Sequence, residues 1–313
     1  MQHIDAETIK KHLGWRETIE ALRSMFREGC EVPPREHHII QNPGREDATL
    51  LLMPAWISGS YAGLKTVTVN PDNAEKGLPT ITGTYELMDG QEGVSLATLD
   101  AAELTARRTV CASALASDYL SRKDATNLLI VGSGRLARYL GFAHAAVRPI
   151  NKILVWARDV GKAEEVAAIY GASGYDASAA HDLEKALAKA HIVSAATLAT
   201  DPLILGEWLR PGTHVDLIGG FKPSMREADD KAVARSSVFV DTREGALQEA
   251  GDLITPIHNG VLSEKDIAAE LSELCSGEHL GRSSEEEITL FKSVGTALED
   301  LAAGILVYES TKH

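Results

Sequence analysis

The sequence predicts a protein of the α/β class, with a doubly wound parallel β-sheet and a second, discontinuous domain of the α+β class. Three observations lead to this prediction. The chain has 313 residues, which is long enough for two domains. Strand-like and helical segments alternate after residue 127, as in α/β proteins. Before residue 90, short strand-like segments are separated by turns, as in an antiparallel sheet.

The region before residue 120 is expected to contain a helix followed by this antiparallel sheet. Apolar residues recur at helical spacing over residues 5–28, and Asp5 is a suitable N-cap. The pair Pro33-Pro34 comes after this segment. Strands are then predicted at residues 38–41, 49–53, 63–69 and 80–88, and a helix at residues 101–120.

The region from residue 127 onward is expected to form the parallel sheet. NLLIV at residues 127–131 is a continuous apolar run, as expected for a strand buried on both faces. The alternation continues with predicted strands at 152–156, 192–196, 214–218 and 238–240, and predicted helices at 136–146, 162–170 and 183–190. Two more helices are predicted at 263–275 and, from the capping box SSEEE at Ser283, at 285–307.

The predicted last helix decides the domain boundaries. It is too long for the parallel-sheet domain alone, so we expect it to pack against the N-terminal region. The sequence therefore predicts one domain formed by residues 1–120 and 294–313, and a parallel-sheet domain formed by residues 121–293.

Composition and charge exclude several classes of function. The net charge is −14, whereas nucleic acids and anionic membranes require a surplus of Lys and Arg on one face. We therefore expect neither partner. Cys30, Cys111 and Cys275 form no CxxC pair, which indicates a reducing cytoplasm. No signal peptide or membrane span is expected, because no apolar run is long enough. His37-His38 have no spaced third ligand, so no metal site is expected.

The strongest local motif is GSGRLA, from Gly132 to Ala137, between a predicted strand and a predicted helix. Gly132 permits a tight turn, Gly134 lets the backbone approach a pyrophosphate, and Ala137 allows close packing of helix on strand. A helix that starts here would offer N–H groups to the phosphates. A GxG sequence is by itself compatible with an ordinary glycine turn, but in this context it predicts a Rossmann dinucleotide-binding site.

The end of the second parallel strand bears on the choice between NAD and NADP. An Asp or Glu at this position accepts hydrogen bonds from the ribose hydroxyls of NAD, but this chain reads Ala157-Arg158. Arg158 is suited to the 2′-phosphate of NADP. The neighbouring Asp159 could instead reach a ribose, and a solvated Arg–Asp pair is the alternative. The sequence favours NADPH and leaves NADH open.

Isolated cations in the N-terminal region are candidates for an anion site. Lys65 lies among β-branched residues, and spacing alone favours a side chain that reaches solvent over one that lines a cleft. Arg107 and Arg108 are adjacent on a helix, so only one of them can face a shared pocket. Arg35 lies in loop-like sequence, where a solvated charge is the default.

A glycine pair follows another predicted Rossmann strand, in DLIGGFKPSMREADD. Gly219 and Gly220 would let the backbone approach the nicotinamide ring, because ligands bind beyond these strand ends. The charged residues that come next are expected to cap and charge a helix: Arg226, Glu227, Asp229 and Asp230. Glu299-Asp300 on the last helix either approach the active site or belong to a solvated face.

Short segments throughout the chain occur in a recognisable order: LLMPAW, GLKTVTV, LMDG, LTARRT, VGSGRLA, DPLILGEWLRPGTHVDLIGGFKP, EAGDL and FKSVGTALEDLAA. Their order and spacing resemble the ornithine cyclodeaminase/mu-crystallin family over nearly the whole chain. The resemblance implies a Rossmann domain together with a discontinuous N- and C-terminal domain that binds substrate and forms a homodimer.

One segment distinguishes branches of this family. Ornithine cyclodeaminases carry an acidic residue directly after the paired glycines, where this chain has Phe221. The segment GGFKPSMREADD is instead similar to that of the Δ1-pyrroline-2-carboxylate reductase, or ketimine reductase, branch. This difference argues against cyclodeamination.

The resemblance also implies roles for individual residues. Lys65 and Arg108 would be catalytic. Substrate would be bound by Arg35, Lys65, Thr84, Arg108 and Gly220. The cofactor would be contacted by Thr80, Ile81, Arg108, Gly132, Ser133, Gly134, Arg135, Leu136, Ala157, Arg158, Thr197, Leu198, Ile218 and Ser293.

The expected reaction is NAD(P)H-dependent reduction of a cyclic α-imino acid. Δ1-Pyrroline-2-carboxylate would give L-proline, and the six-membered Δ1-piperideine-2-carboxylate would give L-pipecolate. Arg108 would hold the carboxylate bidentately, while Lys65 would donate the imine proton or help to hold the carboxylate. Three alternatives stay open: an amino-acid dehydrogenase such as alanine dehydrogenase, an ornithine cyclodeaminase, and a protein that binds NADPH without turnover.

Overall fold

The computed structural model describes residues 1–312, without the side chains of residues 74 and 75. The chain forms two compact units. Unit 1 comprises Met1–Arg108 and Thr296–His313, and unit 2 comprises Thr109–Gly295. This division falls inside the helix over residues 101–120, whereas the division expected from the sequence lies at the end of that helix.

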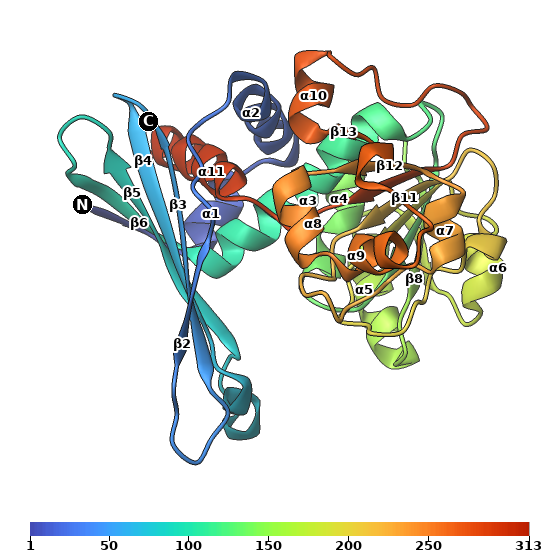
Figure 1. The fold of residues 1–313 in the computed structure, drawn as a ribbon, viewed down its shortest axis with the longest axis horizontal. Coiled ribbons are helices and arrows are strands. Elements are labelled where there is room, and N and C mark those ends of the chain that lie inside the picture. The colour runs from blue at the N-terminus through green and yellow to red at the C-terminus, as the bar shows by residue number, and fades with distance from the viewer. Residues whose placement is uncertain (313) are drawn as a thin grey trace. The chain divides into compact units, whose positions relative to one another are not determined.

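Unit 1 is built on a six-stranded sheet, which is drawn in blue and cyan in Figure 1. The strand order is β1-β6-β5-β4-β3-β2, in which β1 is parallel to β6 and the other neighbours are antiparallel. The strands are β1 (Gln2–Ile4), β2 (Glu36–Ile40), β3 (Ala48–Ile57), β4 (Tyr61–Val69), β5 (Ile81–Asp89) and β6 (Ser95–Asp100). The sequence prediction missed β1 and β6.

The helices of unit 1 are α1 (Ala6–His12), α2 (Trp15–Glu28), α11 (Ala297–Ser310) and the first part of α3 (Ala101–Leu120). The single helix predicted over residues 5–28 is wrong, because Leu13 ends α1 and the extended backbone of Gly14 forms the N-cap of α2. Helix α11 packs against α2, β3 and β4. The predicted packing of the last helix against the N-terminal region is therefore confirmed.

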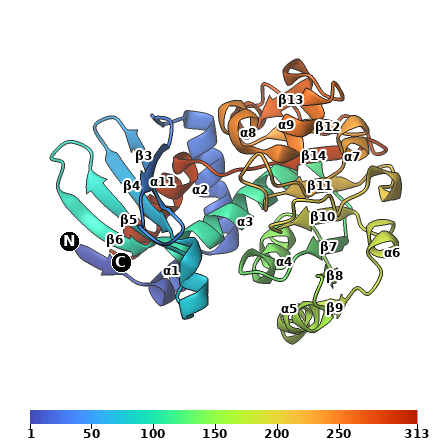
Figure 2. The same ribbon diagram turned by 60° about the horizontal axis from the view of Figure 1, so that its bottom comes forward.

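Unit 2 contains an eight-stranded sheet in which all neighbouring strands are parallel. Figure 2 shows the strands in their order, β13-β12-β14-β11-β10-β7-β8-β9. They are β7 (Asn127–Val131), β8 (Lys152–Trp156), β9 (Asp176–Ala179), β10 (Ile192–Ala195), β11 (His214–Leu217), β12 (Ser237–Val240), β13 (Ile267–Glu270) and β14 (Thr289–Lys292).

Helices cover both faces of this sheet, with α4 and α6 on opposite sides in Figure 2. They are α4 (Leu140–Ala145), α5 (Val160–Ala172), α6 (Leu183–Leu187), α7 (Asp230–Ala234), α8 (Arg243–Glu249), α9 (Gly251–His258) and α10 (Leu271–Ser276), together with the second part of α3. Parallel strands covered on both faces are the doubly wound arrangement. The predicted fold class is confirmed.

Two predicted helices near the C-terminus are wrong. Residues 263–275 form a short 3-10 turn (Glu264–Asp266), the strand β13 and the start of α10. Residues 285–307 contain β14, which lies between β11 and β12, and α11 begins only at Ala297. The N-cap of α11 is Thr296, whose hydroxyl accepts a hydrogen bond from Leu298 N. The predicted capping residue, Ser283, instead binds the carboxylate of Glu287.

Candidate active site

The glycine loop after β7 has the geometry of a dinucleotide-binding turn. Gly132 has a φ of 126°, which L side chains rarely adopt. A Cβ on Gly132 would lie 2.6 Å from the carbonyl oxygen of Ala196, so this turn presses directly on the loop after β10. A Cβ on Gly134 would meet no protein atom within 4 Å. The space that Gly134 leaves open is therefore available to a ligand, and the loop fits the pyrophosphate of a dinucleotide.

The helix that follows the loop differs from the expectation. Residues 136–138 form a 3-10 turn, and α4 begins only at Leu140, so the predicted continuous helix over 136–146 is wrong. Tyr170 on α5 braces this turn: its hydroxyl donates to Ala137 O and accepts from Gly141 N. The phosphates would thus face a short turn rather than the first turn of a long helix.

The predicted cofactor residues of unit 2 gather at one edge of its sheet. They come directly after β7, β8, β10, β11 and β14, which are neighbours in the order β14-β11-β10-β7-β8. Carboxyl ends of parallel strands share one edge, so these loops lie side by side, as dinucleotide binding requires. The residues are Gly132, Ser133, Gly134, Arg135, Leu136, Ala157, Arg158, Thr197, Leu198, Ile218 and Ser293.

At the end of β8, Arg158 is exposed and Asp159 caps the next helix. Arg158 is exposed, and its side chain can reach a phosphate beside the strand end. Asp159 is the N-cap of α5, where its carboxylate accepts a hydrogen bond from Lys162 N at 3.3 Å. Asp159 is the only acidic residue directly after β8, and its carboxylate is engaged in capping α5.

Unit 1 contains a buried cluster of charged side chains, which we call the β4–α11 ion cluster: Lys65, Arg108, Glu299 and Asp300. Lys65 Nζ lies 2.6 Å from Asp300 Oδ2, and Arg108 Nε lies 2.9 Å from Asp300 Oδ1. Arg108 Nη1 lies 2.6 Å from Glu299 Oε2. Asp300 therefore joins both cations, and Glu299 holds the second nitrogen of the guanidinium.

Burial sets the proton affinity of this cluster. Lys65 is 3% exposed, and desolvation lowers its pKa to about 8, although the charge of Asp300 raises it. The charges of Arg108 and, more weakly, Arg35 lower it further. Burial alone would raise the pKa of Asp300, but the two neighbouring cations hold it below its usual value. Lys65 is thus mostly protonated at neutral pH.

These contacts correct the interpretation of several residues. The solvent-reaching orientation that spacing favours for Lys65 is wrong, because Lys65 faces the core beside Tyr85 on β5. Glu299 and Asp300 are fully buried rather than on a solvated face. The adjacent arginines point in different directions, as their helical spacing predicts: Arg107 pairs with Glu103 at 2.9 Å and donates to Leu13 O, whereas Arg108 belongs to the ion cluster.

Of the other predicted residues of unit 1, only Arg35 has a described interaction with this cluster. Arg35 precedes β2 and is close enough for its charge to affect Lys65. Thr84 is exposed. It precedes Tyr85 on β5, so its side chain lies on the opposite face of the sheet from Tyr85 and Lys65. Ile81 is 54% exposed at the start of β5, next to Thr80. The roles of Thr80, Ile81 and Thr84 remain predictions.

The comparison with known proteins agrees with this geometry. Residues 3–313 match the ornithine cyclodeaminase/mu-crystallin family. The chain belongs to that family. A Δ1-pyrroline-2-carboxylate reductase of Paracoccus denitrificans is 41% identical over 292 residues, which cover 92% of this chain and 90% of the relative. The family membership that the sequence motifs predict is therefore confirmed.

Two solved structures share the fold over essentially the full chain. One is a Thermococcus litoralis Δ1-pyrroline-2-carboxylate reductase in complex with NADH and L-proline, with a TM-score of 0.92 and 34% identity, covering 100% of this chain and 98% of that one. The other is an archaeal alanine dehydrogenase dimer with bound NAD, with a TM-score of 0.91 and 28% identity, covering 100% and 96%. Both proteins bind a nicotinamide cofactor.

This member of the ornithine cyclodeaminase/mu-crystallin family has further buried charges that the sequence analysis missed. Glu227, Asp252 and Lys292 are fully buried in unit 2 beside Gly219 and Gly220. Glu227 was expected to charge a helix surface, and that expectation is wrong; Asp229, by contrast, does cap α7. No sequence signal identifies Glu227, because its burial depends on contacts with Thr197 and Gly219, which the fold brings close to it.

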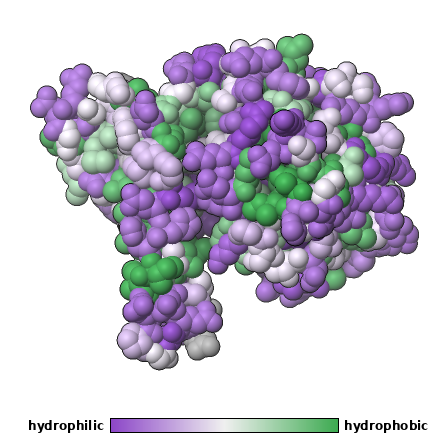
Figure 3. Space-filling model, in the orientation of Figure 1, coloured by the Kyte–Doolittle hydropathy of each residue, from purple (hydrophilic) through white to green (hydrophobic). Residues whose placement is uncertain are grey.

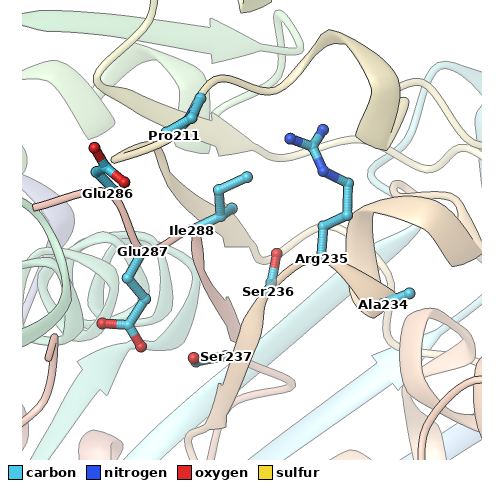
Figure 4. A pocket seen from close by; sticks show the side chains of 8 residues that line it. All are labelled: Pro211, Ala234, Arg235, Ser236, Ser237, Glu286, Glu287 and Ile288. Atoms are coloured by element: carbon cyan, nitrogen blue, oxygen red, sulfur yellow. The ribbon is translucent and has the colours of Figure 1, made fainter. Parts of the chain in front are cut away.

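A separate hollow in this family member lies at the opposite edge of the parallel sheet. It has a volume of about 460 Å³ and is lined by residues at the amino ends of β12 and β14. Figure 4 shows these side chains, with Arg235 facing the hollow from one side and Glu286 and Glu287 from the other. Arg235 donates to the carbonyl oxygens of Gly206 and Leu209. The hollow therefore lies away from the predicted cofactor edge.

Within residues 1–312, no helix is both long and apolar enough to cross a membrane. The same residues contain no group of three or more His, Cys, Asp or Glu side chains arranged to hold a metal ion.

Proposed function

We propose that this chain is an NAD(P)H-dependent ketimine reductase that converts Δ1-pyrroline-2-carboxylate to L-proline and Δ1-piperideine-2-carboxylate to L-pipecolate. The observation that carries the proposal is the β4–α11 ion cluster, in which a buried, protonated lysine and an arginine share one carboxylate. The relatives named as Δ1-pyrroline-2-carboxylate reductases support the same reaction.

The charge of the cluster suits a substrate with one carboxylate. Lys65, Arg108 and nearby Arg35 supply three positive charges against the two carboxylates of Glu299 and Asp300, which leaves one net positive charge. Arg108 Nε and Nη1 are already engaged by these carboxylates. A substrate carboxylate would therefore bind mainly through Nη2, rather than through the bidentate contact expected from the sequence.

Lys65 is the proposed proton donor. The imine nitrogen must gain one proton when the neighbouring carbon gains a hydride, and an ammonium with a pKa of about 8 is largely protonated at neutral pH. Asp300 orients the ammonium through the 2.6 Å contact between Lys65 Nζ and Asp300 Oδ2. The reaction is balanced: the imine, NAD(P)H and one proton give the cyclic amino acid and NAD(P)⁺.

The cofactor assignment rests on unit 2. A bound nicotinamide would supply the hydride, and the loops after β7, β8, β10, β11 and β14 would hold it. We propose a preference for NADPH, with NADH as a second cofactor. Exposed Arg158 supports this preference, as does the absence of a carboxylate at Ala157, and Asp159 is engaged as a helix cap.

Two alternative activities, ornithine cyclodeamination and alanine dehydrogenation, are less well supported. Ornithine cyclodeamination is disfavoured because Phe221 stands directly after the paired glycines and supplies no carboxylate for proton transfer. An alanine dehydrogenase activity is favoured by one observation, the TM-score of 0.91 with the archaeal enzyme. The sequence similarity is higher with the reductases, at 41% and 34% identity, so imine reduction is the preferred assignment.

We also propose a cytoplasmic homodimer. The three cysteines are free thiols, which fits a reducing compartment. The β2 edge and the β4–β5 connection of unit 1 expose Ile39, Ile40, Leu78 and Ile81, and Figure 3 shows green apolar atoms on the lower part of this unit. Exposed apolar groups on an edge strand are suited to a second subunit. Light scattering of the wild type and of Ile39→Asp tests this, since the variant should dissociate.

The proposed reaction is tested by following the loss of NADPH and NADH absorbance. The substrates are Δ1-pyrroline-2-carboxylate, Δ1-piperideine-2-carboxylate, pyruvate with ammonia, and L-ornithine. Rapid oxidation with a cyclic imine alone supports the proposal, and Lys65→Met should reduce kcat by about 100-fold or more. The exposed Lys10→Met variant is the control and should retain full activity. Oxidation that requires pyruvate and ammonia, or ammonia release from ornithine, would overturn the assignment.

A further inference from the structure

A second buried cluster lies in unit 2, beneath the loops that follow β10 and β11. Glu227, Asp252 and Lys292 are each 0% exposed. Lys292 Nζ lies 3.1 Å from Asp252 Oδ2, and Asp252 Oδ1 accepts hydrogen bonds from Glu227 N at 2.7 Å and Ala228 N at 3.0 Å. Burial of three charges is costly, so each needs compensating contacts within the fold.

The two carboxylate oxygens of Glu227 bind two different loops. Oε1 accepts from Thr197 N at 2.7 Å and from the Thr197 hydroxyl at 2.8 Å. Oε2 accepts from Gly219 N at 2.8 Å. Thr197 follows β10 and Gly219 follows β11, so one side chain ties together the ends of two adjacent strands.

The two loops are in direct backbone contact at this point. A Cβ on Gly219 would lie 2.1 Å from Thr197 O and 2.2 Å from Thr197 N, which no side chain could occupy. The loop after β10 in turn touches the glycine turn, since a Cβ on Gly132 would meet Ala196 O. The loops after β7, β10 and β11 are therefore packed one against the next, and Glu227 binds the second and third of them.

The order of the strands indicates which half of the cofactor these loops serve. In a doubly wound sheet the dinucleotide crosses the point where strand order reverses, which here lies between β7 and β10. Strands β8 and β9 lie on the side that holds the adenosine half. Strands β10 and β11 lie on the other side, where the nicotinamide half binds.

We propose that Glu227 is a positioning residue for the nicotinamide half of the cofactor: its carboxylate oxygens fix the loops after β10 and β11 in the arrangement that receives the ring. This inference rests on the proposed function, because it assumes a nicotinamide dinucleotide at this edge. Asp252 accepts a hydrogen bond from the backbone of Glu227, and Lys292 pairs with the carboxylate of Asp252. Burial raises the pKa of Glu227 to about 7, against the opposing effect of Lys292.

Glutamine at position 227 would disturb the loops without changing side-chain size. Its amide group carries two donors where Glu227 has an acceptor, so it would face either Gly219 N or Thr197 N with a donor instead of an acceptor. The adenosine side of the sheet makes none of these contacts among the hydrogen bonds of the described residues. The loss of binding should therefore be restricted to the nicotinamide half.

The test compares binding of NADPH and of 2′-phospho-ADP-ribose, which lacks the nicotinamide, by titration calorimetry. Glu227→Gln should weaken NADPH binding by about tenfold or more and leave the fragment within about twofold. Gly219→Ala, which forces the same loops apart, should show the same selectivity. Asp216→Asn is the matched control: Asp216 is buried on β11 and bonded to Ser113 and Ser194, so it should alter stability without this selectivity.

Each outcome is decisive. Equal loss of NADPH and fragment affinity, or no loss of either, in a folded Glu227→Gln or Gly219→Ala protein would overturn the positioning role. The same selectivity in Asp216→Asn would also overturn it, because general loosening of unit 2 would then be sufficient. A wild-type protein that binds neither NADPH nor the fragment would refute the proposed function itself, and the inference with it.

Discussion

Burial and ion pairing shift the pKa of Lys65 in opposite directions. Desolvation disfavours the ammonium, whereas Asp300 stabilises it through a contact of 2.6 Å. The resulting pKa of about 8 is low for a lysine but still above neutrality. A lysine in this range can give up a proton and regain it, which is the property that an imine reductase needs from its acid.

Removal of the Asp300 charge should shift the pH dependence of the reaction. With Lys65 as the proposed proton donor, its protonated form would be the active one, so kcat/KM should fall as pH rises through about 8. Because Asp300 raises the pKa of Lys65, Asp300→Asn should move this alkaline limb to lower pH. The profile is measured with a cyclic imine at saturating cofactor.

The control for this shift is Glu103→Gln, which breaks another buried ion pair of unit 1, with Arg107. It should reduce stability and leave the alkaline limb in place. Identical pH profiles for wild type and Asp300→Asn would mean that Lys65 is not the acid.

Arg158 should determine the preference between the two cofactors. Its exposed guanidinium at the end of β8 is placed to pair with a 2′-phosphate. Arg158→Ala should reduce kcat/KM with NADPH by about tenfold, as expected for one charged hydrogen bond, and change the value with NADH little. Arg210→Ala is the control, because Arg210 is an exposed arginine of unit 2 that lies beside the amino ends of β7 and β8, away from the cofactor loops. Equal effects on both cofactors would contradict the assignment.

At the scale of elements, close packing of α11 on the sheet brings the ion cluster together. Tyr85 on β5 lies between Gly63 on β4 and Gly304 on α11. A Cβ on Gly304 would lie 2.6 Å from Tyr85 Cε1, and one on Gly63 would lie 2.7 Å from Tyr85 Cζ. The absence of side chains at these glycines lets α11 approach closely enough for Asp300 to reach Lys65.

Gly304→Ala should therefore destabilise the protein although alanine favours helices. Overpacking against the buried Tyr85 ring should cost about 1–3 kcal/mol in the free energy of unfolding. Gly171→Ala on α5 is the matched control, because its Cβ would meet no atom within 4 Å; it should stabilise by up to about 1 kcal/mol. Denaturant titration measures both. Stabilisation by Gly304→Ala would show that α11 packs less tightly than described.

The elements also show where sequence reasoning succeeds and where it fails. The central strands β7 and β8 are predictable because long apolar runs and glycine turns are local signals. The strand β14 is not, because the apolar run around Leu290 and Phe291 becomes a strand only through pairing with β11 and β12. Burial of Glu227 and Asp300 is likewise unpredictable from spacing, since each finds its partners on distant segments.

At the scale of the whole molecule, each of the two buried charge clusters lies within one unit. The β4–α11 ion cluster lies entirely in unit 1, and the Glu227 cluster lies entirely in unit 2. Most residues assigned to the substrate belong to unit 1, and most residues assigned to the dinucleotide belong to unit 2.

Cofactor binding should consequently stabilise the molecule unevenly. A ligand that binds only the folded protein adds about 2.7 kcal/mol to its stability at a free concentration of about 100 times Kd. We expect NADPH to slow amide hydrogen exchange in the loops after β7, β10 and β11, and at Thr80-Ile81 if these residues contact the cofactor as predicted. Strands β1 and β6, at the other edge of the unit 1 sheet, should exchange at unchanged rates and serve as the internal control. Protection spread evenly over both sheets would instead mean that the two units respond to the cofactor as one body.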